Sequence, residues 1–253
     1  MFLLLSNQQH TSKKGLWEGD TLELEVINLN VRIDGKNVLQ GISFKISESE
    51  CLGVVGPNGS GKTALLQSII GLHDGSGTVS FDGRNIHEMD LCREGIYYVP
   101  DNGSFFDMTV RENLEFFYRC YSKNDAVKME SDIDSILGAV RLMGHANSPA
   151  YELSRGMKRR LAYAMTMVSV PSILIMDDPF ANLDTDGRLY LEGYMRTLKI
   201  LGTTLLIGSN DLMDLQEVCD SVVLLRGGCI KDRIKIEEGL DLRERYLESI
   251  RGR

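Results

Sequence analysis

Apolar and polar residues alternate along the first part of the chain. The alternation runs through residues 22–33 and returns at 42–46, which is typical of strands with one buried face. The pairs Asp34-Gly35 and Asp82-Gly83 indicate tight turns, and the second follows a further short run of strand-forming residues. About the first 95 residues are therefore predicted to contain a partly antiparallel sheet.

Continuous apolar runs replace the alternation further along. Residues 51–55, 172–176 and 203–207 are apolar almost throughout, as strands are in a parallel sheet that helices cover on both faces. Residues from about 108 to 169 are rich in Met, Leu and charge, a composition that favours helices. The pattern predicts a mixed α/β core with a helical insertion before Pro171.

A glycine-rich octet follows the first continuous run and precedes a helix predicted over about residues 62–70. It reads Gly56-Pro57-Asn58-Gly59-Ser60-Gly61-Lys62-Thr63 and fits GxxxxGK[ST] at every position. Its glycines allow backbone N–H groups to close around a polyphosphate, and the helix N-terminus adds a favourable dipole. Lys62 is expected to reach the β- and γ-phosphates, and the Thr63 hydroxyl to bind Mg²⁺.

The apolar run Ile173-Leu174-Ile175-Met176 ends in Asp177. An acid at the end of a buried strand can hold Mg²⁺ opposite a phosphate loop, although strands also end in Asp where a turn begins. In combination with the octet, we interpret Asp177 as a metal ligand.

Composition narrows the class of protein. The chain has 253 residues, 43% of them hydrophobic and 25% charged, with a formal net charge of −8, so no nucleic-acid partner is expected. The apolar runs fall well short of the roughly 20 residues that span a bilayer. Five scattered cysteines without a CxxC pair predict reduced thiols in a cytoplasm rather than disulfides or a zinc site.

Three more segments complete a family pattern. Leu153-Ser154-Arg155-Gly156-Met157 precedes a basic stretch, residues 178–184 follow the Asp177 strand, and residues 110–114 read VRENL. With the octet, these segments resemble the ATP-binding subunits of ABC transporters, and are closest in style to those of ABC-2-type exporters. The resemblance covers about residues 21 to 230 and implies an α/β fold: a P-loop NTPase core with an antiparallel β subdomain and a helical insertion.

The patterns and the resemblance together predict how the chain is divided. Residues 1–20 are expected to form a flexible extension, and residues 21–240 an ABC ATPase domain whose helical subdomain covers about 102–169. Residues 241–253 are rich in charge and are expected to form a helical tail.

The resemblance also implies a function and partners. It implies a subunit that binds ATP and Mg²⁺, lies on the cytoplasmic face of the membrane, and powers a transmembrane permease subunit through contacts at about residues 101–120. A second ABC ATPase subunit, identical or different, would complete the assembly, and Ser154 and Gly156 would cap the ATP held by that neighbour. A soluble, non-transport ABC ATPase that acts in assembly or as a nucleotide-dependent switch is the alternative.

Four positions depart from the family pattern. Ile33 stands where the family has an aromatic residue against adenine, Asp101 where it has Gln, Asp178 where it has the general base Glu, and Asn210 where it has a switch His. Asp101 could still reach Mg²⁺, or could be a turn residue after Pro100.

The departures predict slow hydrolysis. Asp178 is one methylene shorter than Glu, so its reach to a water is reduced, and it could instead be a loop acid. Asn210 can donate only a neutral hydrogen bond to a phosphate. We expect either a slow symmetric pair of subunits or the weak site of an asymmetric pair; the transported substrate and its direction are not encoded.

Overall fold

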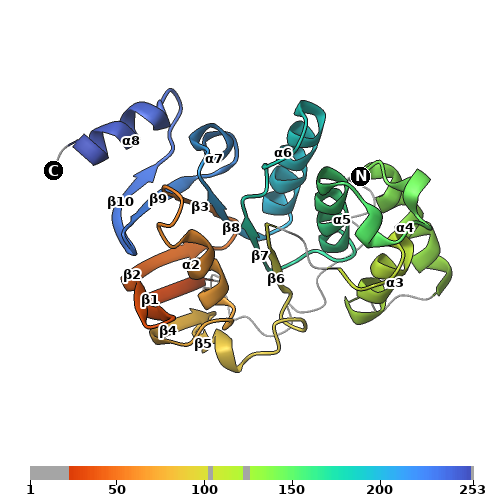
Figure 1. Cartoon of the computed structure of the whole chain (residues 1–253), viewed down its shortest axis with the longest axis horizontal. Helices are drawn as coiled ribbons and strands as arrows, with labels where there is room; N and C mark the ends of the chain where they lie inside the picture. Colours follow the sequence, from red (N-terminus) through yellow and green to blue (C-terminus); the bar gives the residue numbers. More distant parts are fainter. Residues whose placement is uncertain (1–22, 102–104, 122–125, 252–253) are drawn as a thin grey trace.

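The computed structural model describes residues 23–101, 105–121 and 126–251. The extension predicted at residues 1–20 lies outside them. Two sheets and a group of helices form the structure (Figure 1).

The antiparallel sheet has the strand order β2-β1-β4-β5. Its strands are β1 (Glu23–Ile33), β2 (Lys36–Ser47), β4 (Gly75–Phe81) and β5 (Arg84–Asn85). β1 pairs antiparallel with both β2 and β4, so the alternation read from the sequence buries one face, with Leu24 and Val26 fully covered. Asp34-Gly35 and Asp82-Gly83 form the two predicted turns, all four residues with positive φ.

The second sheet has the order β10-β9-β3-β8-β7-β6. Its strands are β3 (Cys51–Val55), β6 (Ile96–Val99), β7 (Ile173–Asp177), β8 (Thr204–Ser209), β9 (Ser221–Arg226) and β10 (Cys229–Lys235). All pairs are parallel except β9 with β10. Alternate residues of one strand belong to different hydrophobic clusters: Leu174 packs under the helices, and Ile175 packs towards the antiparallel sheet.

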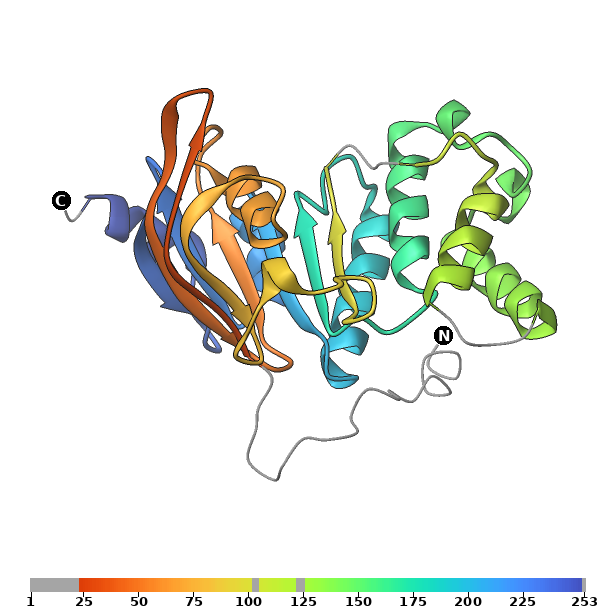
Figure 2. The same ribbon diagram turned by 90° about the horizontal axis from the view of Figure 1, so that it is seen from below.

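Helices cover both faces of this sheet. They are α2 (Lys62–Ile69), α3 (Val110–Tyr121), α4 (Ala126–Ala139), α5 (Arg155–Thr166), α6 (Thr185–Ile200), α7 (Leu212–Val218) and α8 (Leu242–Arg251), with short 3-10 helices η1 (Ile86–Glu88), η2 (Met143–His145) and η3 (Ala150–Glu152). Figure 2 shows α3, α4 and α5 gathered at the end of the molecule away from the antiparallel sheet. Tyr118 of α3 donates a hydrogen bond to Asp132 of α4 at 2.6 Å, which joins these two helices.

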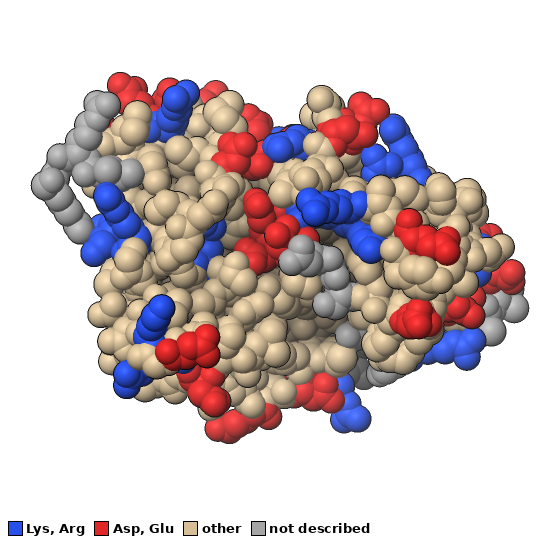
Figure 3. Space-filling model, viewed as in Figure 1, with Lys and Arg blue, Asp and Glu red and all other residues tan. Residues whose placement is uncertain are grey.

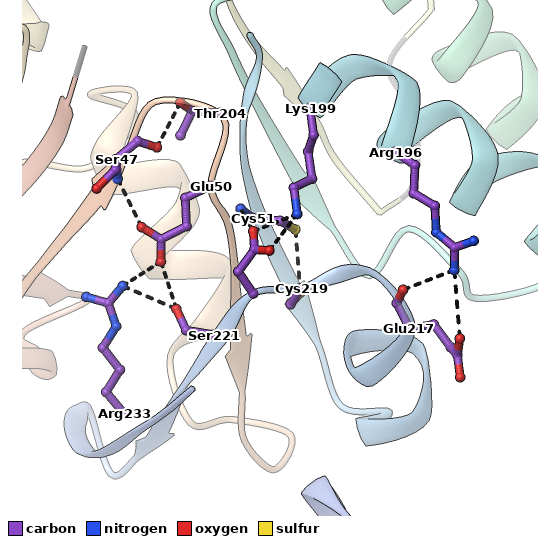
Figure 4. Close-up of polar contacts among 11 residues, drawn as sticks. Ser47, Glu50, Cys51, Arg196, Lys199, Thr204, Glu217, Cys219, Ser221 and Arg233 are labelled. Carbon is purple, nitrogen blue, oxygen red and sulfur yellow. Dashed lines mark hydrogen bonds and ion pairs between the residues drawn. The ribbon is translucent and has the colours of Figure 1, made fainter. Parts of the chain in front are cut away.

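Polar contacts fix the start of β3, the strand that leads into the glycine loop. Glu50 accepts hydrogen bonds from Ser221 at 2.9 Å and from Arg233 at 2.7 Å, so one carboxylate links the β2–β3 turn to β9 and β10 (Figure 4). The buried thiols of Cys51 and Cys219 lie 3.5 Å apart. These contacts hold β3 in register between its neighbours.

The topology brings distant segments to one edge. β3, β8 and β7 are adjacent and parallel, so the residues that follow their carboxyl ends meet there. Such an edge is where open α/β sheets bind ligands. Among the described residues, no helix has both the length and the apolar character needed to cross a membrane.

Candidate functional site

The glycine loop between β3 and α2 is shaped by close backbone packing. Gly59 and Gly61 have φ of 78° and 105°, a region that side chains disfavour. A methyl group at Gly56 would overlap the carbonyl oxygen of Leu225, and one at Gly61 would lie 2.9 Å from Leu39. Close packing therefore requires glycine at positions 56 and 61, and the positive φ favours it at 59.

Lys62 and Thr63 open α2 directly behind the loop. The Lys62 ammonium donates to the carbonyl oxygens of Gly56 at 2.7 Å and Pro57 at 3.3 Å, so it lies inside the loop. Burial lowers the pKa of Lys62, against the opposing effect of Asp177. The Thr63 hydroxyl donates to the Asp177 carboxylate at 2.7 Å, which places the two predicted metal ligands together.

Asp178 follows β7 with an unusual backbone. Its φ is 46°, its N–H donates to the carbonyl oxygen of Gly208 at 2.7 Å, and its carboxylate accepts from the Ser209 hydroxyl at 3.4 Å. Burial raises the pKa values of Asp177 and Asp178, and the charge of Asp101 raises them further. Carboxylates held in this way accept protons more readily than exposed ones.

These groups surround a cavity of about 630 Å³. Its lining residues are Val38, Asn58, Gly59, Gly61, Lys62, Thr63, Ala64, Gln67, Tyr98, Pro100, Asp101, Asp177, Asp178 and Asn210. Asn210 also donates to the side chain of Asn58 at 3.4 Å. Acidic and basic side chains gather near the middle of the face in Figure 3.

Outside the glycine loop, three predicted site residues are absent from this lining: Ile33, Ser154 and Gly156. Ile33 ends β1 and packs against the cluster of the antiparallel sheet, whereas Val38 of β2 lines the cavity. Ser154 is the N-cap of α5 and accepts from the N–H of Met157 at 3.3 Å. Gly156 follows in the first turn of that helix, so both are placed at a helix N-terminus away from the chain's own cavity.

Sequence reasoning did not identify Arg159 as part of the site. Its guanidinium lies on α5, 6% exposed, and donates to the carbonyl oxygen of Asp101 at 2.7 Å, to the Asp101 carboxylate and to the carbonyl oxygen of Asp178. One turn further along, the Tyr163 hydroxyl donates to the carbonyl oxygen of Pro179. The signal was present in the sequence, because residues 159, 162, 163 and 166 have the spacing of one buried helix face.

An apolar cavity of about 360 Å³ lies beside β6. Phe105, Phe106 and Phe117 line it together with α5 residues. Phe106 and Phe116 stack edge to face at 4.6 Å and are 44% and 40% exposed, whereas Tyr118 is buried. The aromatic region expected at a partner contact is therefore part core and part surface.

The site residues fit a magnesium nucleotide. The buried Ser60 hydroxyl has no hydrogen-bond partner among the described residues, so an acceptor is missing inside the loop. Backbone donors, one lysine and a hydroxyl–carboxylate pair are the groups that bind a polyphosphate and its Mg²⁺. Gly56 to Thr63 would hold the phosphates, and Thr63 and Asp177 the metal.

A phosphate loop between β3 and α2, facing acids at the ends of neighbouring parallel strands, defines the class of P-loop NTPases. The family model described as ABC transporter matches residues 39–181. The chain belongs to the ABC transporter family, and its fold is that of the ATP-binding domain.

Relatives and solved structures agree with this assignment. The chain is 34% identical to Nod factor export ATP-binding protein I of Rhizobium etli over 76% of this chain and 62% of that protein. It is 33% identical to the protein of the same name from Burkholderia lata, over 79% and 67%. The chain therefore spans about two thirds of the length of these relatives.

The structure of an ATP-binding subunit of an ABC transporter superposes with a TM-score of 0.81 at 25% identity, covering 90% of this chain and 99% of that one. The structure of cbiO1 from Clostridium perfringens, described as part of the ABC transporter complex cbiONQ, gives 0.69 at 27% identity and covers 89% and 90%.

Proposed function

We propose that this chain binds Mg-ATP, hydrolyses it slowly, and powers a transmembrane permease subunit, in an exporter. The observation that carries the proposal is the convergence of Lys62, Thr63 and Asp177 around one cavity closed by the glycine loop. The cavity volume of about 630 Å³ is within the usual range for small-molecule sites.

The binding groups act first. Backbone N–H groups of the loop and the Lys62 ammonium bind the β- and γ-phosphates, while Val38 and neighbouring aliphatic groups contact the base. Ile33 packs against the hydrophobic cluster of the antiparallel sheet and is absent from the cavity lining, so Val38 takes the place expected for it. Mg²⁺, when bound at Thr63 and Asp177, neutralises developing charge on the phosphates.

The catalytic groups are weaker. Asp178 accepts a proton from the attacking water, a role that its raised pKa favours, but its side chain is short. Asn210 orients the γ-phosphate or the water with a neutral hydrogen bond. Asp101 lines the same cavity, but its carboxylate is paired with Arg159, so in this proposal Thr63 and Asp177 hold the metal. Hydrolysis is consequently slow.

Two partner subunits complete the proposed transporter. A second ABC ATPase subunit, identical or different, receives the α5 N-terminus with Ser154 and Gly156 against its own nucleotide. The permease contacts the exposed aromatic residues Phe106 and Phe116, and the assembly lies on the cytoplasmic face of the membrane. We infer export as the direction of transport because the relatives are named as export proteins.

Nucleotide binding is the first test. Lys62→Ala should abolish Mg-ATP binding or weaken it by at least about a hundredfold, because it removes a half-buried cation from a polyanion site. The matched control is Lys235→Ala, which removes an exposed lysine from β10. Isothermal titration calorimetry that gives equal affinities for wild type and Lys62→Ala would refute the phosphate-loop assignment.

The membrane partner is tested separately. Purification of the full chain from membranes should recover a permease subunit, and Phe106→Glu should reduce that recovery without changing Mg-ATP affinity. A chain that binds Mg-ATP yet copurifies with no membrane protein would favour the soluble, non-transport alternative.

A further inference from the structure

The wall of the cavity carries an excess of negative charge. Its described lining residues include three carboxylates, Asp101, Asp177 and Asp178, and a single cation, Lys62. The ligand proposed for this cavity is itself an anion. Each carboxylate without a compensating charge therefore opposes binding of the phosphates.

In the proposed site Asp177 binds Mg²⁺ and Asp178 acts on the attacking water. The negative charge of Asp101 is instead compensated by Arg159, which lies beneath it. The Arg159 guanidinium forms an ion pair with the Asp101 carboxylate and also holds its carbonyl oxygen at 2.7 Å. The Arg159 side chain is 6% exposed and that of Asp101 is 49% exposed, so the acid faces the cavity and the base lies beneath it. A buried guanidinium is retained only where acceptors satisfy it.

The same guanidinium reaches a second loop. It donates to the carbonyl oxygen of Asp178, and Tyr163 on the next turn of α5 donates to that of Pro179. Asp101 after β6 and the residues Asp178 and Pro179 after β7 are thus held by one face of one helix. Asp178 needs such restraint because its φ of 46° is unfavourable for a residue with a side chain.

We propose that Arg159 is a positioning residue of the nucleotide site: it neutralises Asp101 and clamps the loops that carry Asp101 and Asp178. This inference rests on the proposed function, because the benefit of neutralising Asp101 appears only when an anion binds. Arg159 itself contacts no nucleotide in this scheme. Its effect on binding passes through the charge of Asp101.

A double-mutant cycle on the full-length chain tests the charge component. Arg159→Gln should raise the Kd for Mg-ATP about tenfold, equivalent to about 1.4 kcal/mol, because it leaves Asp101 unpaired beside the phosphates. Adding Asp101→Asn should return the Kd to within about threefold of wild type. Arg196→Gln, which removes an exposed arginine of α6 from a loose ion pair with Glu217 of α7, is the matched control and should bind as wild type does.

A purely structural role predicts a different result. Arg159→Gln would then lower the melting temperature, and Asp101→Asn would not restore affinity. Wild-type affinity in Arg159→Gln, or no recovery in the double variant, would overturn the neutralising role.

Arg159→Lys tests the clamp and guards against a variant that fails to fold. Lysine keeps the charge but cannot bridge both loops, so Mg-ATP affinity should stay within about threefold of wild type. In the nucleotide-free chain, amide hydrogen exchange should become at least about tenfold faster for Asp178 and for Ala181, whose N–H donates to the Asp178 carbonyl oxygen. Unchanged exchange would overturn the clamp.

The two proposals fail in distinguishable ways. If wild type and Lys62→Ala bound Mg-ATP equally, the proposed function would be wrong, yet the exchange measurement would still report whether Arg159 holds the two loops.

Discussion

Asp178 is held at every backbone atom that can form a hydrogen bond. Its N–H is bound by Gly208, its carbonyl oxygen by Arg159 and Ala181, and its φ of 46° is thereby maintained. The side chain has little freedom to compensate for its length. At the scale of the residue, the short side chain of Asp178 is therefore expected to limit the rate of ATP hydrolysis.

Restoring reach and charge should accelerate hydrolysis. Asp178→Glu combined with Asn210→His should raise steady-state phosphate release by at least about tenfold, because general-base catalysis depends on hydrogen-bond contact with the water. Asp178→Asn combined with Asn210→His should show no such gain. A wild type that is already fast, and that the double change does not improve, would show that the short acid is sufficient.

Asp214 makes stability depend on pH. It lies in the first turn of α7, where burial and then the charge of Asp211 raise its pKa to about 6, although Arg188 pairs with it. The unfolded carboxyl ionises near about pH 4, so between about pH 4 and 6 the folded state keeps a proton that the unfolded state has lost. The contribution of this group to stability therefore falls as pH rises through that window.

Asp214→Asn should remove this dependence. In urea unfolding, wild type should lose about 1 kcal/mol relative to the variant between pH 4.5 and pH 7, a figure reduced for solvent screening. Subtracting the variant cancels the titration of all other groups. A difference that stays constant with pH would mean that the Asp214 pKa is not raised.

The sequence was a good guide to residues whose role lies in a local pattern. The octet and Asp177 could be placed because a loop and a strand end were sufficient to describe them. For Arg159 the helical spacing could have indicated a buried position, but not its role, which depends on Asp101, 58 positions away, and on the backbone carbonyl of Asp178. Val38 lines the cavity for a similar reason: the β1–β2 turn decides which strand residue faces it.

At the scale of the element, glycines have opposite roles in β3 and α6. A methyl group at Gly53 in β3 would lie 2.8 Å from Val222 and 3.1 Å from both Cys219 and Leu215. Gly193 in α6 has no atom within 4 Å of the same position. The strand has no space for a side chain, whereas the helix would accept one.

Two alanine substitutions should therefore shift stability in opposite directions. Gly53→Ala should lower the free energy of unfolding by about 1–3 kcal/mol through overpacking. Gly193→Ala should raise it by about 0.5–1 kcal/mol, because glycine inside a helix costs backbone entropy. Chemical denaturation measures both, and a stable Gly53→Ala variant would mean that β3 can move away from α7.

The success of predicting a helix or strand from the sequence depended on how much of that element is buried. β3 and the start of α2 coincide with the predicted run and helix, because continuous burial on both faces leaves a clear apolar pattern. β10 was not predicted: of its residues only Ile234 is fully buried, and its pairing with β9 is what makes it a strand. Edge strands of this kind carry little pattern in their own sequence.

At the scale of the whole molecule, symmetric and asymmetric arrangements of the subunits predict different effects for two variants. If a standard partner subunit supplies a strong site, then Gly156 of this chain serves that strong site and Asp178 serves only the weak one. Gly156→Glu should then lower the ATPase activity of the purified complex by at least about tenfold, and Asp178→Asn by less than about twofold. Equal losses would indicate a symmetric pair.

One helix extends between these two sites. α5 has 12 residues; Ser154 is its N-cap and Gly156 lies in its first turn, while Arg159 and Tyr163 further along contact Asp101, Asp178 and Pro179. In the proposed dimer, a neighbour's nucleotide that binds at Ser154 and shifts this helix would shift Arg159 with it. Occupancy at one site then alters affinity at the other, and thermodynamic linkage makes the effect reciprocal. ATP binding to the assembled dimer is therefore expected to be cooperative, with α5 as the path of communication.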